Sequence, residues 1–489
     1  MPFLIEHVTE VVVTVILTVL ILTTGLCVVA VTRRQRRERY FQRLDELRQR
    51  FGPVITAVLT EKIEYARGLS ALKSISGLDR DFILEQLCLE KRVTPAQVPI
   101  LRKLCEDLGL VRGWQRRLTG QIDVASLRDA IARPEGMVER IGRLGFLLRA
   151  KGAENLGTIL HHESWPLLVR ALEDRHPDVR AVALRSLGAI GEQKSFPRLL
   201  EQLHAVVLKP ASPLSLRAVK AALVNFPLQH AGGLLDTLRH SHPRLRFLAT
   251  DIIREMVDRQ AAMAEDFVLE PELFAPQLAE VFLTELCFDE NADVRARAAP
   301  VVAYVRDPRA TPALLTLLED SQWFVRLHAV RALAKRQYMP QAAQIAGRLT
   351  DAHWMVREGA ARTLLVFGRV GTDQLTQHFL GTKDRYSQEQ ITDEMQRAGL
   401  IPVLLAQYAS ETDAKGGQVI EQLAEMGKTS YMLEVLQSSS ERSVRKKFLQ
   451  DFGRHSDPQI QAWVRILATR ETDPELRALA QNAVGRQGN

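Results

Sequence analysis

Three short stretches of this 489-residue sequence contain residue types that bind phosphate, metal ions or dinucleotides in other proteins. The first, MGKTS at residues 426–430, carries the Gly-Lys-Thr of a phosphate loop, but Gln422 stands where the first glycine of that motif belongs. Gly427 also follows the helical run QVIEQLAEM. The sequence therefore favours a helix C-cap over a nucleotide site at this position.

The other two stretches lack the context that their chemistry needs. His161 and His162 have no HExxH spacing and no cysteine nearby, which favours two turn histidines over a metal site. RIGRLG, residues 140–145, does not follow a strand and so does not predict a dinucleotide loop. We therefore expect no catalytic motif, no cofactor and no metal, although a site assembled from distant helices stays open.

Four cysteines occur without a CxxC spacing and without a histidine at ligand spacing, and they are Cys27, Cys88, Cys105 and Cys287. This usage predicts reduced, structural thiols in the cytosol.

One polar pattern does recur. In four places an aspartate is followed five and six residues later by a Val-Arg pair, and the spacing between Val294, Val325 and Val356 is 31 residues. The four pairs of aspartate and arginine are Asp174 and Arg180, Asp289 and Arg295, Asp320 and Arg326, and Asp351 and Arg357. A fixed period of this size predicts a solenoid, which accommodates a long chain without one large core.

Each period predicts two helices joined by a short turn. Apolar residues stand zero, four and eight positions after the Val or Leu that precedes each arginine, on one helical face, and the middle one is usually alanine. An amphipathic segment such as TPALLTLLED precedes the turn, and Pro177, Pro243 and Pro474 suit the first turn of the second helix. Alternating Val/Ile/Thr runs are absent after the first thirty residues, so we predict an all-α fold.

With these features the chain resembles the HEAT-repeat family, in particular short bacterial HEAT-like repeats and those of phycobilisome lyases. The resemblance covers residues 136–489 well and residues 53–135 weakly. It implies an α-solenoid in which each turn aspartate and the arginine six residues later form a polar ladder between stacked units. His240 replaces the aspartate before Leu245, so Arg246 is expected to lack that partner.

The resemblance also implies that second helices line a concave face. Basic side chains stand three or six residues after the repeated Val, where stacking could align them, and they are Arg185, Arg297, His328, Arg331 and Arg362. Such a stripe would attract an acidic segment of a partner, and an ordinary solvated face is the alternative. Trp323 and Trp354 hold equivalent positions on the turn edge, where they either seal a repeat joint or anchor a partner.

The N-terminus predicts a membrane anchor. Residues 11–31, VVVTVILTVLILTTGLCVVAV, hold 21 residues without a charge. A helix of that length is about 30 Å long and crosses the hydrocarbon layer. The preceding flank has Glu6 and Glu10 and no basic residue, unlike a signal peptide, and Cys27 follows Leu26, unlike a lipoprotein cysteine.

A basic collar follows this span. It begins with Arg33, Arg34, Arg36, Arg37 and Arg39, and residues 33–50 hold eight arginines against three acidic residues, a balance of +5 in a net charge of +7. The basic charge therefore indicates anionic lipid rather than nucleic acid. The positive-inside rule predicts that residues after 32 are cytoplasmic.

The predicted layout has five parts: a short extracytoplasmic tail (1–10), a transmembrane helix (11–31), a basic juxtamembrane helix (32–52), a degenerate helical region (53–135) and a HEAT-repeat solenoid (136–489). We expect a non-enzymatic, single-pass protein of the inner (plasma) membrane whose solenoid recruits a protein partner. The suggestion that this partner belongs to the cell-envelope machinery rests on fold analogy alone. A bilin-lyase-like enzyme and a HEAT-like nucleic-acid-binding protein are the alternatives.

Overall fold

The computed structural model describes residues 2–75, 80–89, 93–121, 137–209, 214–264, 267–270, 274–337, 339–410, 414–438 and 442–485. The side chains of residues 2–15 and 137–144, of several residues between 33 and 44, and of Phe82, Ala414 and Ser438 lie outside this description. The chain divides into two compact units, residues 1–234 and 235–489. Every regular element in the described ranges is a helix, apart from an isolated bridge between Leu269 and Val305. The all-α prediction is confirmed.

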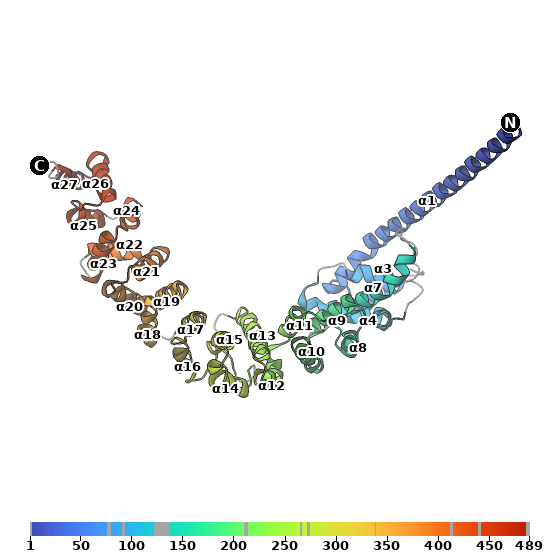
Figure 1. Cartoon of the computed structure of the whole chain (residues 1–489), viewed down its shortest axis with the longest axis horizontal. Helices are drawn as coiled ribbons and strands as arrows, with labels where there is room; N and C mark the ends of the chain where they lie inside the picture. The colour runs from blue at the N-terminus through green and yellow to red at the C-terminus, as the bar shows by residue number, and fades with distance from the viewer. Residues whose placement is uncertain are drawn as a thin grey trace. The chain divides into compact units, whose positions relative to one another are not determined.

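The first unit starts with a long helix and continues with helices that pack pairwise (Figure 1). Its α-helices are α1 (Pro2–Leu59), α2 (Tyr65–Lys73), α3 (Arg80–Leu89), α4 (Val98–Asp107), α5 (Leu110–Leu118), α7 (Met137–Thr158), α8 (Trp165–Ala171), α9 (Pro177–Ile190), α10 (Phe196–Leu208) and α11 (Leu216–Val224). RIGRLG lies within α7, and the described residues directly before it, 137–139, are also helical.

The second unit stacks further helical hairpins. They are α12 (Leu235–Leu238), α13 (Pro243–Ala261), α14 (Pro276–Thr284), α15 (Ala292–Val302), α16 (Ala310–Leu317), α17 (Trp323–Arg336), α18 (Ala342–Ala346), α19 (Trp354–Val366), α20 (Gly368–Gly381), α21 (Arg385–Arg397), α22 (Leu400–Ala409), α23 (Ala414–Glu425), α24 (Thr429–Ser438), α25 (Arg442–Phe452), α26 (Pro458–Arg470) and α27 (Pro474–Gly485). Helices α21 and α23 lie between Val356 and Val444, in a part of the sequence that lacks the repeated Val-Arg pair.

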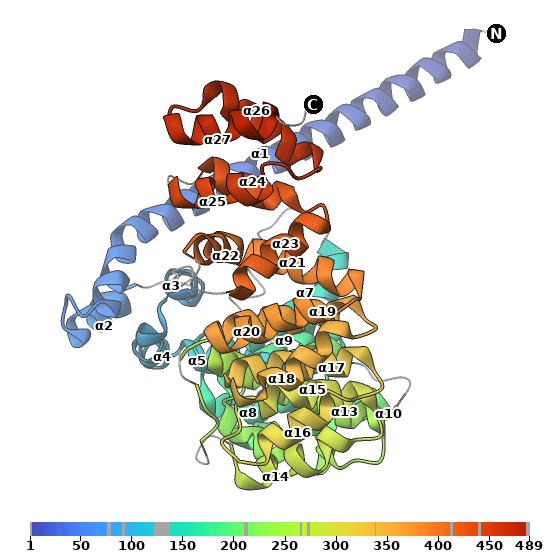
Figure 2. The ribbon, with the colours of Figure 1, turned by 90° about the vertical axis from the view of Figure 1, so that its left-hand side faces the viewer.

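The second helix of each hairpin buries the predicted apolar stripe. In α17, Val325, Ala329 and Leu333 are at most 1% exposed, and the equivalent residues of α15 and α19 are also buried. Burying one such Val or Leu contributes about 1.5–3 kcal/mol, and the small middle residue lets the next helix approach. Consequently α13, α15, α17 and α19 lie side by side within this unit, with α14, α16 and α18 outside them (Figures 1 and 2).

Residues 53–121 pack onto the repeats through a buried polar cluster. Glu85 on α3 accepts hydrogen bonds from Trp114 Nε1 (3.0 Å) and Arg117 Nη1 (2.6 Å) on α5 and from Asn155 Nδ2 (2.8 Å) on α7. Glu85 and Asn155 are at most 3% exposed. A buried carboxylate is stable only with such donors, so this cluster fixes α3 and α5 against α7.

The predicted tail, span and collar belong to one continuous helix, the 58-residue α1. The described side chains from residue 16 to residue 32 are all exposed, including Leu20 (60%) and Leu26 (69%). By contrast, Phe51 and Ile55 are buried where the end of α1 meets α2, α3 and α4.

Residues 11–15 of the predicted span lie outside the described side chains. Within the part of the chain that was described in full, no helix combines the length and the apolar character needed to cross a membrane.

Candidate functional site

In four places an arginine on one repeat binds a turn carboxylate of the next repeat, and we call each such contact a joint. Arg295 donates from Nε and Nη2 to the Asp320 carboxylate (2.7 and 3.0 Å), and Arg326 donates in the same way to Asp351 (2.6 and 2.6 Å). Two further joints share this geometry, Arg149 with Asp174 and Arg246 with Asp289. Two parallel N–H donors on one carboxylate form the strongest common type of side-chain hydrogen bond.

The predicted pairs, six residues apart, meet through the backbone and not through the carboxylate. Arg326 donates from Nη1 to the main-chain carbonyl of Asp320 (2.8 Å). The same contact occurs between Arg180 and Asp174, Arg295 and Asp289, and Arg357 and Asp351. The Asp320 carboxylate is held within its turn by the N–H of Gln322 (2.9 Å), where the arginine of the preceding repeat reaches it. Carboxylate pairing is therefore displaced by one repeat from the sequence expectation.

Arg246 also differs from the sequence expectation, because it does have a carboxylate partner. It was predicted to lack a carboxylate because His240 precedes it, but Asp289 of the following repeat supplies one (2.7 Å from Nε). The carbonyl of His240 accepts from Arg246 Nη1 (3.0 Å), so the backbone half of the pattern persists without the aspartate.

Three of the four joint carboxylates have lowered pKa values, which keep them charged at neutral pH. Burial raises the pKa of Asp320 and Asp351, but the N–H donors of the preceding arginine and of the turn outweigh it. The net pKa of both carboxyls therefore lies below the usual range, and so does that of Asp174. Each joint is an ion pair that is largely withdrawn from water, with side-chain exposures of 13% for Arg326 and 3% for Asp351.

Sequence reasoning missed the variants of this arrangement nearer the C-terminus. Gln388 Nε2 donates to the Thr382 carbonyl (2.9 Å), and Gln461 Nε2 donates to the His455 carbonyl (2.6 Å). Glu471 takes the aspartate position and accepts from Arg445 Nη1 of the preceding repeat (3.1 Å). The shared signal is a polar residue six positions before a side-chain donor, which a search for Asp and Arg alone does not find.

Carboxylates neutralise much of the predicted basic stripe in the second unit. Arg297 on α15 forms an ion pair with buried Asp251 on α13 (3.2 Å) and lies over the ring of Phe247 (5.6 Å). Asp251 also accepts from Arg254 (2.9 Å), which donates in turn to Asp258 (2.7 Å). The neighbourhood of Arg297 is thus a charge network and not a bare cationic surface.

Arg362 on α19 belongs to a second network. Glu394 on α21 accepts from Arg362 (3.0 Å) and Arg397 (2.5 Å), and Glu358 lies 2.5 Å from Arg362. The Glu394 side chain is only 3% exposed. Its two arginines therefore compensate a buried charge, and Arg362 adds little free positive charge to the face.

Arg331 differs from its neighbours on this face. It is exposed on α17, between α15 and α19, and it has no hydrogen bond or ion pair with any residue that the structure describes. His328 on the same helix is half-buried, and its burial, then Arg297, Arg331 and Arg254, lower its pKa to about 4. The imidazole is neutral at pH 7, so the free positive charge of this face is centred on Arg331. Arg185 is exposed on α9 of the first unit.

The two tryptophans have different environments. The imidazole of His353 stacks on half-buried Trp323, with ring centroids 3.8 Å apart and planes 3° apart. Trp354 is 53% exposed, and its ring centroid lies 6.3 Å from that of His353. Trp323 therefore seals a joint, whereas Trp354 presents a ring to solvent.

The motifs considered first have structural surroundings. Gly427 adopts a left-handed φ of 71° just after α23, which confirms the predicted C-cap. His161 is buried with Nδ1 2.8 Å from Ser164 Oγ, and this burial lowers its pKa. No group of three His, Cys, Asp or Glu side chains suited to a metal ion occurs in the described ranges. The cysteines are free thiols, and burial raises the pKa of Cys287 to about 12.

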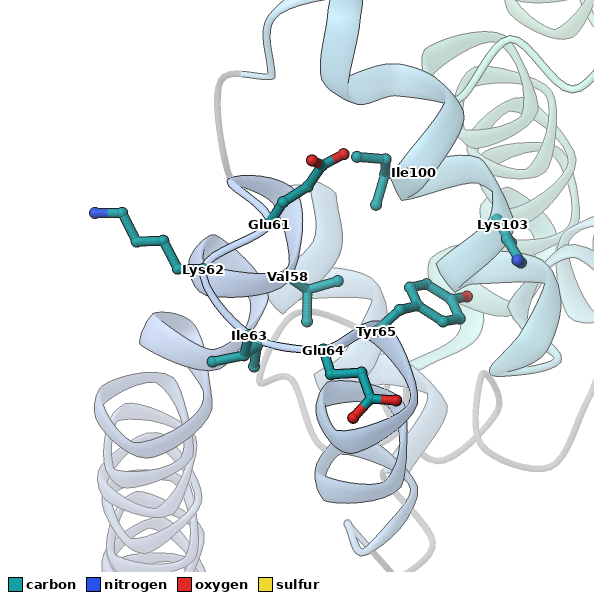
Figure 3. A pocket seen from close by; sticks show the side chains of 8 residues that line it. All are labelled: Val58, Glu61, Lys62, Ile63, Glu64, Tyr65, Ile100 and Lys103. Carbon is teal, nitrogen blue, oxygen red and sulfur yellow. The ribbon is translucent and has the colours of Figure 1, made fainter.

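A hollow of 480 Å³ lies where α1 ends, lined by residues of α1, the following turn, α2 and α4 (Figure 3). Tyr65 donates to Asp107 (2.7 Å), and Lys103 lies 4.9 Å from the Tyr65 ring centroid. Figure 3 shows Lys62 pointing away from the Tyr65 and Ile100 side chains. No histidine or cysteine lines this hollow, and its lysines and glutamates form no convergent acid–base pair.

The basic collar lies on α1 beyond the exposed apolar stretch. Arg34 pairs with Glu38 (2.9 Å), and Arg39 is exposed. The side chains of Arg33, Arg36 and Arg37 lie outside the described residues.

Residues 146–207 and 279–365 match the HEAT-repeat family, and these segments contain the joints of Arg149, Arg295 and Arg326. Similar solved structures include importin beta (13% identity, 88% of this chain and 64% of that chain, TM-score 0.40). They also include an engineered protein (15% identity, 87% and 100%, TM-score 0.29) and human deoxyhypusine hydroxylase in complex with glycerol (18% identity, 59% and 96%, TM-score 0.22). No curated protein sequence has significant similarity to this chain.

Proposed function

We propose that this chain, a helical scaffold containing HEAT repeats, is anchored in the inner membrane by α1 and holds a protein partner on its cytoplasmic repeats. Catalysis is not part of this proposal, because the sequence contains no catalytic motif and the hollow at the end of α1 lacks a convergent acid–base pair.

The exposed apolar stretch of α1 supports the anchor. From residue 16 to residue 32 one helix exposes large apolar side chains such as Leu20, Ile21 and Leu26. A continuous apolar surface of this kind is unfavourable in water and is normally covered by lipid or protein. The uncharged run of 21 residues has the length of the hydrocarbon layer, and the arginine collar suits anionic headgroups on the cytoplasmic side.

The proposed partner surface rests on the environment of Arg331. An exposed, uncompensated guanidinium between two charge-compensated clusters attracts a single carboxylate of a partner. The partner chemistry that fits is therefore an acidic protein segment lying across α15, α17 and α19. Compensation of Arg297 and Arg362 by carboxylates disfavours nucleic acid, whose phosphates need a broader basic surface.

A crosslinking experiment in intact membranes tests this proposal. A photoreactive amino acid placed at Val366, an exposed residue at the end of α19, captures proteins that lie near this face in the full-length chain. We expect one dominant partner, and we expect Arg331→Glu to reduce its capture at least about tenfold, as for an interfacial charge whose sign is reversed. Arg385→Glu is the matched control, because Arg385 is also exposed in the second unit but pairs with Glu389 (3.3 Å).

Equal capture by wild type and a folded Arg331→Glu variant would refute the partner surface across α15, α17 and α19, which we call the inner face. Fractionation answers the membrane question separately: the full-length chain should be extracted by detergent and not by carbonate or salt.

A further inference from the structure

Two joints share an arrangement of four residues. An arginine of one repeat binds an aspartate of the next, and an aromatic residue three positions before that arginine stacks on a histidine two positions after that aspartate. In the first unit, Arg149 binds Asp174 (2.6 and 3.0 Å), and Phe146 stacks on His176 with centroids 3.5 Å apart and planes 8° apart. In the second unit, Arg326 binds Asp351 and Trp323 stacks on His353. The incoming segment is Asp-X-His in both cases.

At the start of α19 the chain has the aromatic residue and the arginine of this arrangement, but the next repeat lacks the aspartate and the histidine that would bind them. Trp354 and Arg357 stand three and six residues after Asp351, as Trp323 and Arg326 stand after Asp320. In the repeat that follows, however, Thr382 takes the aspartate position and Asp384 takes the histidine position.

The substituted residues do not supply the missing contacts. Thr382 Oγ1 accepts the N–H of Asp384 (3.2 Å), and the Asp384 carboxylate accepts the N–H of Tyr386 (3.1 Å) as the N-cap of α21. Arg357 keeps its backbone contact from Nη1 to the Asp351 carbonyl (2.8 Å), but its Nε is buried without a hydrogen-bond acceptor among the described residues. Such a donor is costly to leave unsatisfied.

Exposed aromatic side chains and one exposed lysine flank this position, together with the Asp384 carboxylate. Trp354 is 53% exposed, and Tyr386, at the start of α21, is 73% exposed. Lys383 is exposed on the intervening turn. A carboxylate arriving here would meet positive charge, and a flat ring beside it would cover Trp354 as His353 covers Trp323.

We propose that Trp354 and Arg357 form a docking site for a partner turn of the form Asp-X-His, or one with another flat ring in place of the histidine. The carboxylate binds the Arg357 guanidinium while the ring stacks on Trp354. This inference rests on the proposed role in protein binding, but it places a contact on the turn edge, away from Arg331 on the inner face.

A peptide with the sequence of residues 173–178, EDRHPD, is a suitable probe because it carries the incoming half of a complete joint and contains no tryptophan. Fluorescence anisotropy of this labelled, end-capped peptide with the full-length chain in nanodiscs measures binding. We expect saturable binding that weakens at least about tenfold in Arg357→Gln, since hydrogen bonds to a charged group are lost. Trp354→Ala and a peptide with asparagine in place of its Asp174 should weaken binding similarly.

Two further variants separate a built site from general attraction. Arg385→Gln removes the same charge from an exposed neighbour and should leave binding unchanged. Thr382→Asp combined with Asp384→His supplies the missing half from the chain itself, so it should abolish peptide binding and raise the melting temperature. If this double variant does not fold, Arg357→Gln and Trp354→Ala still decide the outcome.

No saturable binding, or an equal loss in Arg385→Gln and Arg357→Gln, would overturn the site. The Arg331→Glu variant distinguishes the two proposals. If the peptide still binds to this variant and membrane crosslinking to the wild type shows no partner, the result supports the turn-edge site and counts against the inner-face proposal. Peptide binding that disappears with Arg331→Glu in a folded chain would overturn the turn-edge site.

Discussion

The register of the ladder can be tested by asking which aspartate is energetically coupled to Arg326. The structure pairs its guanidinium with the carboxylate of Asp351, in the following repeat, and with only the backbone carbonyl of Asp320. Replacing Arg326, Asp351 and Asp320 by alanine, singly and in the two relevant pairs, gives two double-mutant cycles. Their coupling free energies should differ.

The magnitude follows from burial. Removing one partner of a buried ion pair costs about 3–5 kcal/mol, and the partial exposure of Arg326 places it near about 3 kcal/mol. Asp351→Ala should cost a similar amount. The Arg326/Asp351 pair should show a coupling of about 2 kcal/mol, because each single change already breaks the same contact. For Arg326/Asp320 the coupling should be below about 1 kcal/mol, since Asp320→Ala leaves the carbonyl in place.

Hydrogen exchange measured by mass spectrometry on the full-length chain in nanodiscs is the appropriate assay. Repeat arrays open locally, so the opening free energies of α17 and α19 report on this joint more directly than a global melt. Peptides from α4 and α5, in the first unit, provide an internal control. A larger coupling for Arg326/Asp320 than for Arg326/Asp351 would refute the assignment of carboxylates between repeats.

Three other outcomes are expected. The depressed pKa values of Asp174, Asp320 and Asp351 mean that the joints stabilise the fold above the unfolded carboxyl pKa of about 4 and lose that contribution as pH falls through the folded values; acid should therefore increase exchange at α17 and α19 before it does so at α4. The His328 ring should titrate near pH 4 in an NMR experiment, and a midpoint above 6 would contradict its burial among arginines. A phosphatase that is active only outside the cytoplasm, fused after Asn489, should be inactive in cells, and activity would contradict the proposed topology.

Much of the repeat fold was predictable because it is encoded locally. The Val–Ala–Leu stripe with a helical period identified the second helices, and Ala329 and Leu333 are buried as that stripe requires. Proline at the first turn placed the starts of α9, α13 and α27 correctly. These signals depend on residues within one helix, which is why a single sequence contains them.

The side-chain pairs that form between different helices and turns were not predictable in the same way. Asp320 lies close in sequence to Arg326, yet its carboxylate binds Arg295, because the turn N–H groups fix its orientation toward the preceding repeat. Arg297 and Arg362 suggested a basic stripe, but Asp251 and Glu394 on neighbouring helices compensate them. Sequence spacing aligns residues on one face, whereas charge compensation across helices depends on packing that spacing does not specify.

The uninterrupted α1 sets a stand-off distance between the proposed anchor and the packed helices α2, α3 and α4 of the first unit. Between residue 32, where the exposed apolar stretch ends, and Phe51, the first buried residue among the described side chains, the helix rises about 28 Å at 1.5 Å per residue. A partner embedded in the same bilayer would need at least about eight extended residues outside the membrane to cross that height and reach the packed end of α1. The scaffold would therefore select partners by the length of their cytoplasmic tails before any side chain is recognised.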